Sequence, residues 1–134
     1  PDFIKLGGKD VEGTVFAGEA FTIVDDLADN DPFKKTPATY ISAYKAAHGA
    51  PPTIFGAHTF DAIALIEPAV EAAVKAAKPG TSEFRAAVRD EIEKTKNRYL
   101  NNGLANMTPE DHSGYDERSA FIIKIENGTF RLVK

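Results

Sequence analysis

The sequence contains no cysteine and no tryptophan, and it has a single methionine among its 134 residues. The absence of cysteine excludes disulfide scaffolds, zinc sites built from thiolates, and cysteine nucleophiles. Long hydrophobic runs are also missing, because stretches such as 62–66 and 120–123 fall far below the roughly 18 to 20 apolar residues that cross a bilayer. We therefore expect neither a disulfide-stapled domain nor a membrane-spanning one.

Clusters of basic residues are scarce as well. The chain has 16 Lys and Arg against 20 Asp and Glu, a formal net charge of −4, with the two signs intermixed. A nucleic-acid-binding protein needs a basic patch or stripe, so nucleic acid is not an expected partner. What remains is a globular balance of 43% hydrophobic and 27% charged residues, which suits one ordinary domain with a packed core.

The chain begins at Pro1, with neither an initiator methionine nor a basic-then-apolar signal segment. A signal segment would be the mark of export in a sequence. We therefore expect a processed or truncated start, and the cellular compartment has to be inferred from resemblance.

Strand patterns lie near both ends of the chain. Residues 14–17 are rich in β-branched and aromatic side chains, while residues 120–125 form a nearly continuous apolar run. The Asn127-Gly128 pair separates that run from residues 130–133. Asn-Gly tolerates the positive φ angles of a tight hairpin, so we predict one short strand early in the chain and a hairpin at its end.

Three helices are predicted between these strands. The first has Thr36 as its N-cap, Pro37 at its first position and Gly49 as its stop, in keeping with cap preferences. The second runs from about Phe60 to Ala77, with apolar residues at helical spacing and a kink at Pro68, because proline removes an internal hydrogen bond.

The third helix is capped by Thr81 or Ser82 and carries Glu83 in its first turn, where the helix dipole favours negative charge. The fold class is therefore α/β, with few strands for so much helix. Helices with one apolar face must pack against another layer, so we expect part of the sheet to lie outside this chain.

The first candidate site is the segment 55–61, which is read as a loop entering the second helix. The free N–H groups at a helix start can bind a carboxylate, here at residues 58–60 with Thr59 at the helix start. Phe55 offers an aromatic face and His58 a hydrogen-bond donor. In the alternative interpretation Thr59 is only a helix cap and the phenylalanines belong to the core.

The second candidate is the acidic segment 107–117 around His112. It lacks the alternating oxygen ligands of a calcium loop and the second His or Cys that zinc requires. A polar loop whose side chains bond their own backbone is the favoured interpretation. A metal-assisted hydrolase that uses His58, Asp61, Asp111 and His112 is kept as a remote alternative.

Five short motifs occur in a recognisable order, and together they span nearly the whole chain. They are Val11-Glu12-Gly13-Thr14, the segment Tyr40 to Gly49, Phe60-Asp61-Ala62, Pro79-Gly80-Thr81 with Phe84-Arg85, and Gly103 through Met107 to Gly114. In this order they resemble the periplasmic substrate-binding proteins of ABC uptake systems, in the branch of branched-chain amino acid and aromatic acid receptors.

The resemblance implies a two-lobed type I periplasmic-binding-protein fold with Rossmann-like lobes and three hinge crossings, of which this chain is the C-terminal portion. It further implies that residues 1–19 end the second lobe and that residues 20–102, with three helices, belong to the first lobe. Residues 103–134 would then form the final crossover and a hairpin that returns to the second lobe.

The function implied is capture of a small carboxylate-bearing solute, an amino acid or aromatic acid, by closure of the lobes. Phe55 matches a position whose aromatic ring touches the ligand, and Ala57 and His58 match positions facing the cleft. Histidine is unusual there, which leaves the solute class open. The expected partners are an ABC permease and the remainder of the same chain, in the periplasm, with no cofactor and no enzymatic activity. A ligand-sensing domain of a receptor or regulator with this fold is the alternative.

Overall fold

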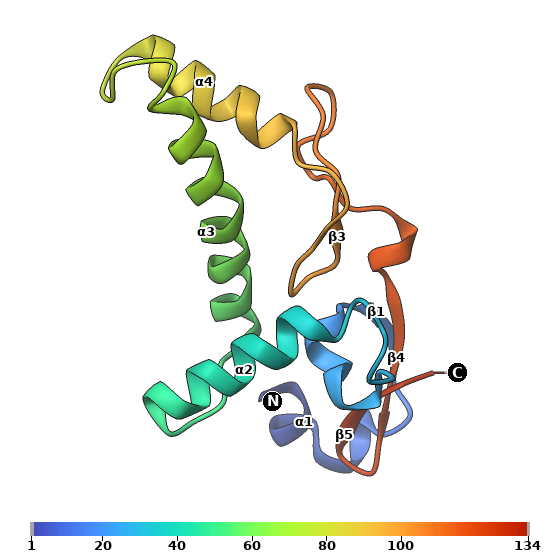
Figure 1. Cartoon of the computed structure of the whole chain (residues 1–134). Helices are drawn as coiled ribbons and strands as arrows, with labels where there is room; N and C mark the ends of the chain where they lie inside the picture. Colours follow the sequence, from blue (N-terminus) through green and yellow to red (C-terminus); the bar gives the residue numbers. More distant parts are fainter. Residues whose placement is uncertain (1, 134) are drawn as a thin grey trace.

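The computed structural model describes residues 2–133 (Figure 1). Among these residues no helix combines the length and the apolarity needed to cross a membrane. The elements in chain order, with η for 3-10 helices, are α1 (Asp2–Gly7), η1 (Gly8–Val11), β1 (Val15–Gly18), η2 (Ala20–Asp26), α2 (Lys35–His48), α3 (Ile54–Ala73), α4 (Ser82–Glu93), β2 (Arg98–Tyr99), β3 (Leu104–Ala105), η3 (Glu117–Ser119), β4 (Phe121–Glu126) and β5 (Thr129–Leu132).

The predicted strands form one antiparallel sheet in the order β1-β4-β5. Figure 1 shows the early strand β1 beside the late strand β4, so the structure pairs the two predicted strand regions near the chain ends. The hairpin between β4 and β5 is also confirmed, with Asn127 at φ 54° and Gly128 at φ 69°. The α/β class is correct, although the sequence did not predict α1 or the small β2-β3 pair.

The helix α2 ends where the sequence predicts but begins slightly earlier. Gly49 adopts φ 71° and donates its N–H to the carbonyl of Lys45, so it is the predicted stop. Thr36 is not the cap, because the helix starts at Lys35 and the Thr36 hydroxyl donates to the carbonyl of Tyr99 at 2.9 Å. The Thr36 side chain, which the local pattern assigns to capping, thus bonds a residue 63 positions away in the sequence.

The start of α3 is the main correction. The helix begins at Ile54, and Thr53 caps it by accepting the N–H of Gly56 at 3.3 Å. Thr59 lies inside the helix, so its predicted role as cap is wrong. Glycine is a poor helix former, and Gly56 in the first turn makes this stretch look like a loop in the sequence. At the other helix, Thr81 caps α4 as predicted, accepting the N–H of Phe84 at 3.2 Å.

Two separate apolar cores hold these elements together. One core joins η2 to the inner face of the sheet through Ala20, Ile23, Leu27 and Ile123. The other joins α3 and α4 to the segment after α4, through buried Leu100, Ala105 and Met107. In Figure 1 they correspond to the lower sheet region and the upper helical region.

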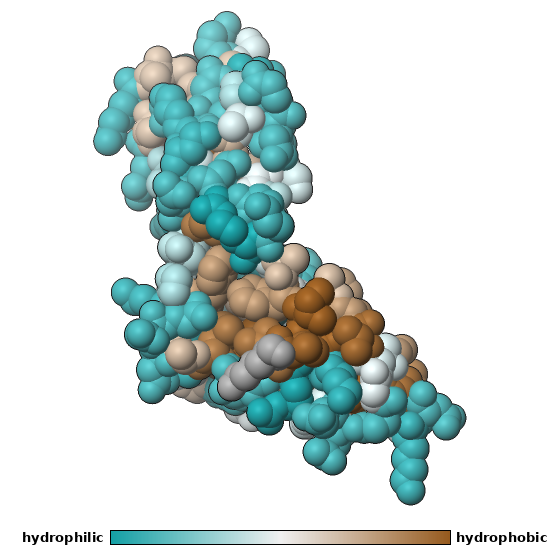
Figure 2. Space-filling view, turned by 90° about the vertical axis from the view of Figure 1, so that its right-hand side faces the viewer, coloured by the Kyte–Doolittle hydropathy of each residue, from teal (hydrophilic) through white to brown (hydrophobic). Residues whose placement is uncertain are grey.

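Apolar side chains are exposed on α3 and on the sheet. On α3, Ile63 and Ile66 are 57% and 43% exposed, and on the sheet Val15 and Ile122 are 56% and 50% exposed. Figure 2 shows hydrophobic side chains gathered on the surface of the sheet region. Patches of this kind mark contact surfaces, in agreement with the expectation that further layers of the fold lie outside this chain.

Candidate functional site

A pocket of about 410 Å³ lies where α3, the end of β1 and the segment 102–120 meet. We call it the junction pocket, and its lining residues are Ala17, Gly18, Glu19, His58, Asn102, Tyr115, Asp116, Ser119 and Ala120. Three stretches that are far apart in the sequence therefore form a single concave surface. Polar side chains on a partly apolar wall are typical of small-molecule sites.

His58 and Glu19 face each other across one side of the junction pocket. The Nε2 atom of His58 lies 3.8 Å from Oε1 of Glu19. Their side chains are 45% and 34% exposed, so a solute can reach both. This pair offers a proton donor and a carboxylate within one contact region.

Phe55 lies one turn before His58, on the first turn of α3. Its side chain is 77% exposed, and its ring lies edge-on to the His58 imidazole with centroids 6.4 Å apart. A large apolar ring left this open has no core role in the described chain. Phe55 is therefore available for contact with a solute or with another part of the protein.

Ala57 and Thr59 have structural roles instead. Ala57 is fully buried, and its carbonyl accepts from Nδ2 of Asn101 at 3.5 Å. The Thr59 hydroxyl donates to the carbonyl of Phe55 at 3.0 Å. Because α3 starts at Ile54, the N–H groups of residues 58–60 lie within the helical hydrogen-bond ladder and do not form the predicted carboxylate dock.

Asp61 is the residue whose importance the sequence pattern did not reveal. Its side chain is 3% exposed, and burial raises the pKa of Asp61, while hydrogen bonds from Asn101 and Asn102 oppose that rise. A carboxylate on the buried face of α3, directly after Phe60 at position 61, was a usable signal.

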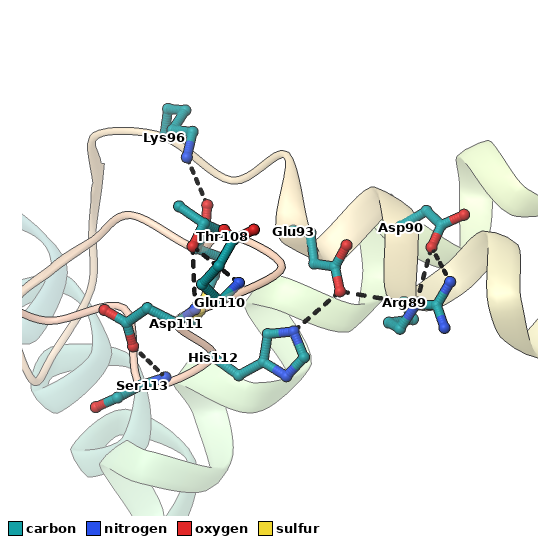
Figure 3. A network of polar contacts seen from close by, with 10 residues as sticks. Arg89, Asp90, Glu93, Lys96, Thr108, Glu110, Asp111, His112 and Ser113 are labelled. Carbon is teal, nitrogen blue, oxygen red and sulfur yellow. Dashed lines mark hydrogen bonds and ion pairs between the residues drawn. The ribbon is translucent and has the colours of Figure 1, made fainter.

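The acidic segment 107–117 behaves as the sequence predicts. The Thr108 hydroxyl oxygen accepts the N–H of Asp111 at 3.0 Å, and Oδ1 of Asp111 accepts the N–H of Ser113 at 2.9 Å. Figure 3 shows this turn docked on α4, where His112 lies 2.9 Å from Glu93. The segment is a polar loop that satisfies its own backbone.

The metal-assisted alternative has no support from this geometry. Among residues 2–133, no three His, Asp or Glu side chains come together to hold a metal ion. Of the four residues in that hypothesis, Asp61 and Asp111 accept backbone N–H groups and His112 contacts Glu93.

A second hollow, of about 450 Å³, lies between α3 and the end of α4, with Leu65 and Arg98 among its lining residues. None of the predicted ligand contacts lies in it. The junction pocket, which contains His58 and unites three distant segments, is the stronger candidate.

Comparison with known proteins gives a consistent set of relatives. No protein-family model and no curated protein matches the chain. A solved extracellular ligand-binding receptor from Rhodopseudomonas palustris HaA2 is 62% identical with a TM-score of 0.91, covering 98% of this chain and 37% of that one. A second receptor from the same strain is 33% identical with a TM-score of 0.87, covering 99% and 38%.

More distant solved structures extend the likeness. The leucine-binding protein LivK from Thermotoga maritima is 26% identical with a TM-score of 0.69, covering 100% of this chain and 33% of that one. A candidate branched-chain amino acid ABC transporter protein from Rhodospirillum rubrum is 29% identical with a TM-score of 0.62, covering 99% and 34%. The chain thus spans little more than a third of the length of these relatives.

Proposed function

The chain belongs to the family of extracellular ligand-binding receptors and leucine-binding proteins, with part of a type I periplasmic-binding fold, and from this premise we propose that it serves solute capture for an ABC uptake system. The solute proposed is a small carboxylate-bearing molecule, either an amino acid or an aromatic acid. The protein would act in the periplasm as a binding protein and not as an enzyme.

The observation that supports this proposal is that distant segments of the chain together form the walls of the junction pocket. Its walls come from the end of β1, from α3 and from the segment 102–120, which the resemblance assigns to different lobes and to the crossings between them. A solute held between lobes favours the closed state by the difference between its affinities for the closed and open forms. A pocket at such a meeting point is where that difference would arise.

His58 and Phe55 are the proposed solute contacts from α3. His58 presents a ring nitrogen at the pocket surface and Phe55 an exposed ring beside it. Ala57, predicted from the resemblance, and Thr59, predicted as the helix start, lie on the same helix and are not proposed as solute contacts, because Ala57 is buried and the Thr59 hydroxyl donates to the carbonyl of Phe55. The remaining contacts would come from the rest of the protein, and the closed form would be recognised by a membrane permease.

The test uses the full-length protein and isothermal titration with a panel of amino acids and aromatic acids. We expect one class to bind, and we expect His58→Ala to weaken that binding by about three- to tenfold, the usual value of one hydrogen bond. His48→Ala is the matched control, because His48 ends α2 and does not line the junction pocket. Silence of the wild-type protein across both classes would refute the proposed function.

A further inference from the structure

A buried carboxylate is hydrogen-bonded to Asn102, one of the residues that line the junction pocket. Asp61 follows His58 by three residues on α3, and its side chain is 3% exposed. Its oxygens are filled by N–H donors: Oδ1 accepts from the backbone and the side chain of Asn101 at 3.0 and 2.7 Å, and Oδ2 accepts the backbone N–H of Asn102 at 3.0 Å. These bonds span 40 and 41 residues of sequence.

Asn101 also connects a third element, η2, to α3. The carbonyl of Asn101 accepts the backbone N–H of Phe21, on η2, at 3.2 Å. The side chain of Asn101 also reaches the carbonyl of Ala57 at 3.5 Å. The backbone at residues 101 and 102 is therefore held between α3 on one side and η2 on the other.

This clamped backbone continues into the pocket wall. Asn102 lines the junction pocket, and two residues later the N–H of Leu104 is bound by the hydroxyl oxygen of Ser119 at 2.9 Å. Tyr115, another lining residue, packs on the buried cluster that contains Leu100. Burial first, and then the negative charge of Asp61, raise the pKa of Tyr115.

Packing alone does not account for a carboxylate at this position. Burying a charged group is unfavourable unless hydrogen bonds compensate for it, and an apolar residue here would leave the N–H groups of Asn101 and Asn102 without their acceptors. Charge-assisted hydrogen bonds are short and directional. What they supply here is a defined position of the 101–102 backbone relative to α3.

We propose that Asp61 is a positioning residue for solute binding, which holds the pocket wall at Asn102 and Tyr115 in register with His58 on α3. The proposal rests on the proposed function, because it concerns the same pocket. Asp61 itself contacts no solute; it sets the spacing of the groups that do.

The discriminating variant is Asp61→Asn in the full-length protein. Asparagine keeps the size and one acceptor oxygen but lacks the second acceptor that the N–H groups of Asn101 and Asn102 require between them. Asp26→Asn is the matched control. Asp26 also holds a remote strand, accepting the N–H of Leu132 at 2.8 Å and pairing with Arg131 at 2.8 Å, and it does not line the pocket.

The first measurement is hydrogen–deuterium exchange without solute. We expect Asp61→Asn to increase exchange in peptides covering 99–103 and 115–120 by about tenfold, the effect of one lost charge-assisted bond, with the sheet protected. Asp26→Asn should increase exchange near 129–133 instead. Unchanged or uniformly increased exchange in Asp61→Asn overturns the proposal. Should that variant fail to fold, Asn101→Ala, which removes the side-chain amide but keeps the backbone donors to Asp61, is expected to show the same local pattern more weakly.

The second measurement is titration with L-leucine and with benzoate, well below the unfolding temperature. For the probe that the wild-type protein binds, Asp61→Asn should weaken binding about tenfold or more, while Asp26→Asn should leave the Kd unchanged even if both variants melt earlier. A purely structural role would lower the melting temperature without moving the Kd, and that result overturns the proposal. If the wild-type protein binds neither probe, the proposed function loses its support, and the exchange measurement still decides the role of Asp61.

Discussion

The imidazole Nε2 of His58 lies 3.8 Å from Oε1 of Glu19, and this pair joins α3 to the residue that follows β1. We predict that a double-mutant cycle of His58→Gln and Glu19→Gln gives a coupling below about 1 kcal/mol, because exposed ion pairs are screened by water. Urea unfolding of the full-length protein and its variants measures this coupling, and a value well above about 1 kcal/mol would contradict the prediction.

The pH dependence of stability provides a test of the environment of Asp61. Burial raises the pKa of Asp61 above its ordinary value of 3.8, so the folded state holds this proton to higher pH than the unfolded state does. Stability contributed by the protonated form is therefore fully present below pH 3.8 and is lost as the pH rises through the folded pKa.

The measurement compares wild-type protein with Asp61→Asn by denaturant unfolding between about pH 3 and pH 7. The wild-type advantage should shrink as the pH rises. An advantage that grows with pH would mean that the hydrogen bonds from Asn101 and Asn102 outweigh burial.

The start of α3 can be tested with two threonines of the same helix. Thr53→Ala removes the cap that accepts the N–H of Gly56, and we expect a loss of about 1 kcal/mol in the free energy of unfolding. Thr59→Ala removes only a hydroxyl that donates to a carbonyl within the helix, and it should change stability by less than about 0.5 kcal/mol. Chemical denaturation measures both losses. A larger loss for Thr59→Ala than for Thr53→Ala would support a helix that starts near Phe60.

Gly103 is a steric test of the pocket wall. A methyl group at this position would overlap the side chain and backbone of Ser119, whose hydroxyl oxygen binds the N–H of Leu104. We expect Gly103→Ala to cost about 1 to 3 kcal/mol, as overpacking does, and to weaken solute binding. Gly49→Ala, in open space at φ 71°, carries only a backbone cost and should leave binding unchanged. Thermal unfolding and titration separate the two effects.

The exposed apolar faces predict the behaviour of the isolated 134-residue chain. Ile63 on α3 and Ile122 on the sheet are at least half exposed, and uncovered patches promote association. We expect the isolated chain to bind a hydrophobic dye and to sediment as an oligomer, whereas the full-length protein should do neither. A monomeric chain that does not bind the dye would show that these faces need no cover.

Local patterns predicted the elements whose conformations depend on neighbouring residues. Three such predictions are correct: the Asn127-Gly128 hairpin, the stop at Gly49 and the cap at Thr81. Each depends on a positive φ angle or on a capping hydrogen bond between residues only a few positions apart. The acidic loop is correct for the same reason. The predicted start of α3, near Phe60, was wrong because Gly56 weakens the helical pattern of the first turn, which Thr53 caps.

The amino-acid sequence alone therefore determined the fold class and the family resemblance, and it predicted that the segment now seen as the start of α3 contributes to a solute site. Only the tertiary structure decided that Thr36 binds the carbonyl of Tyr99 and that Asp61 binds the backbone of Asn101 and Asn102. The physical reason is distance along the chain. A buried polar group takes whichever partner the packed core brings to it, and those partners lie 40 to 63 residues away, beyond the reach of any local pattern.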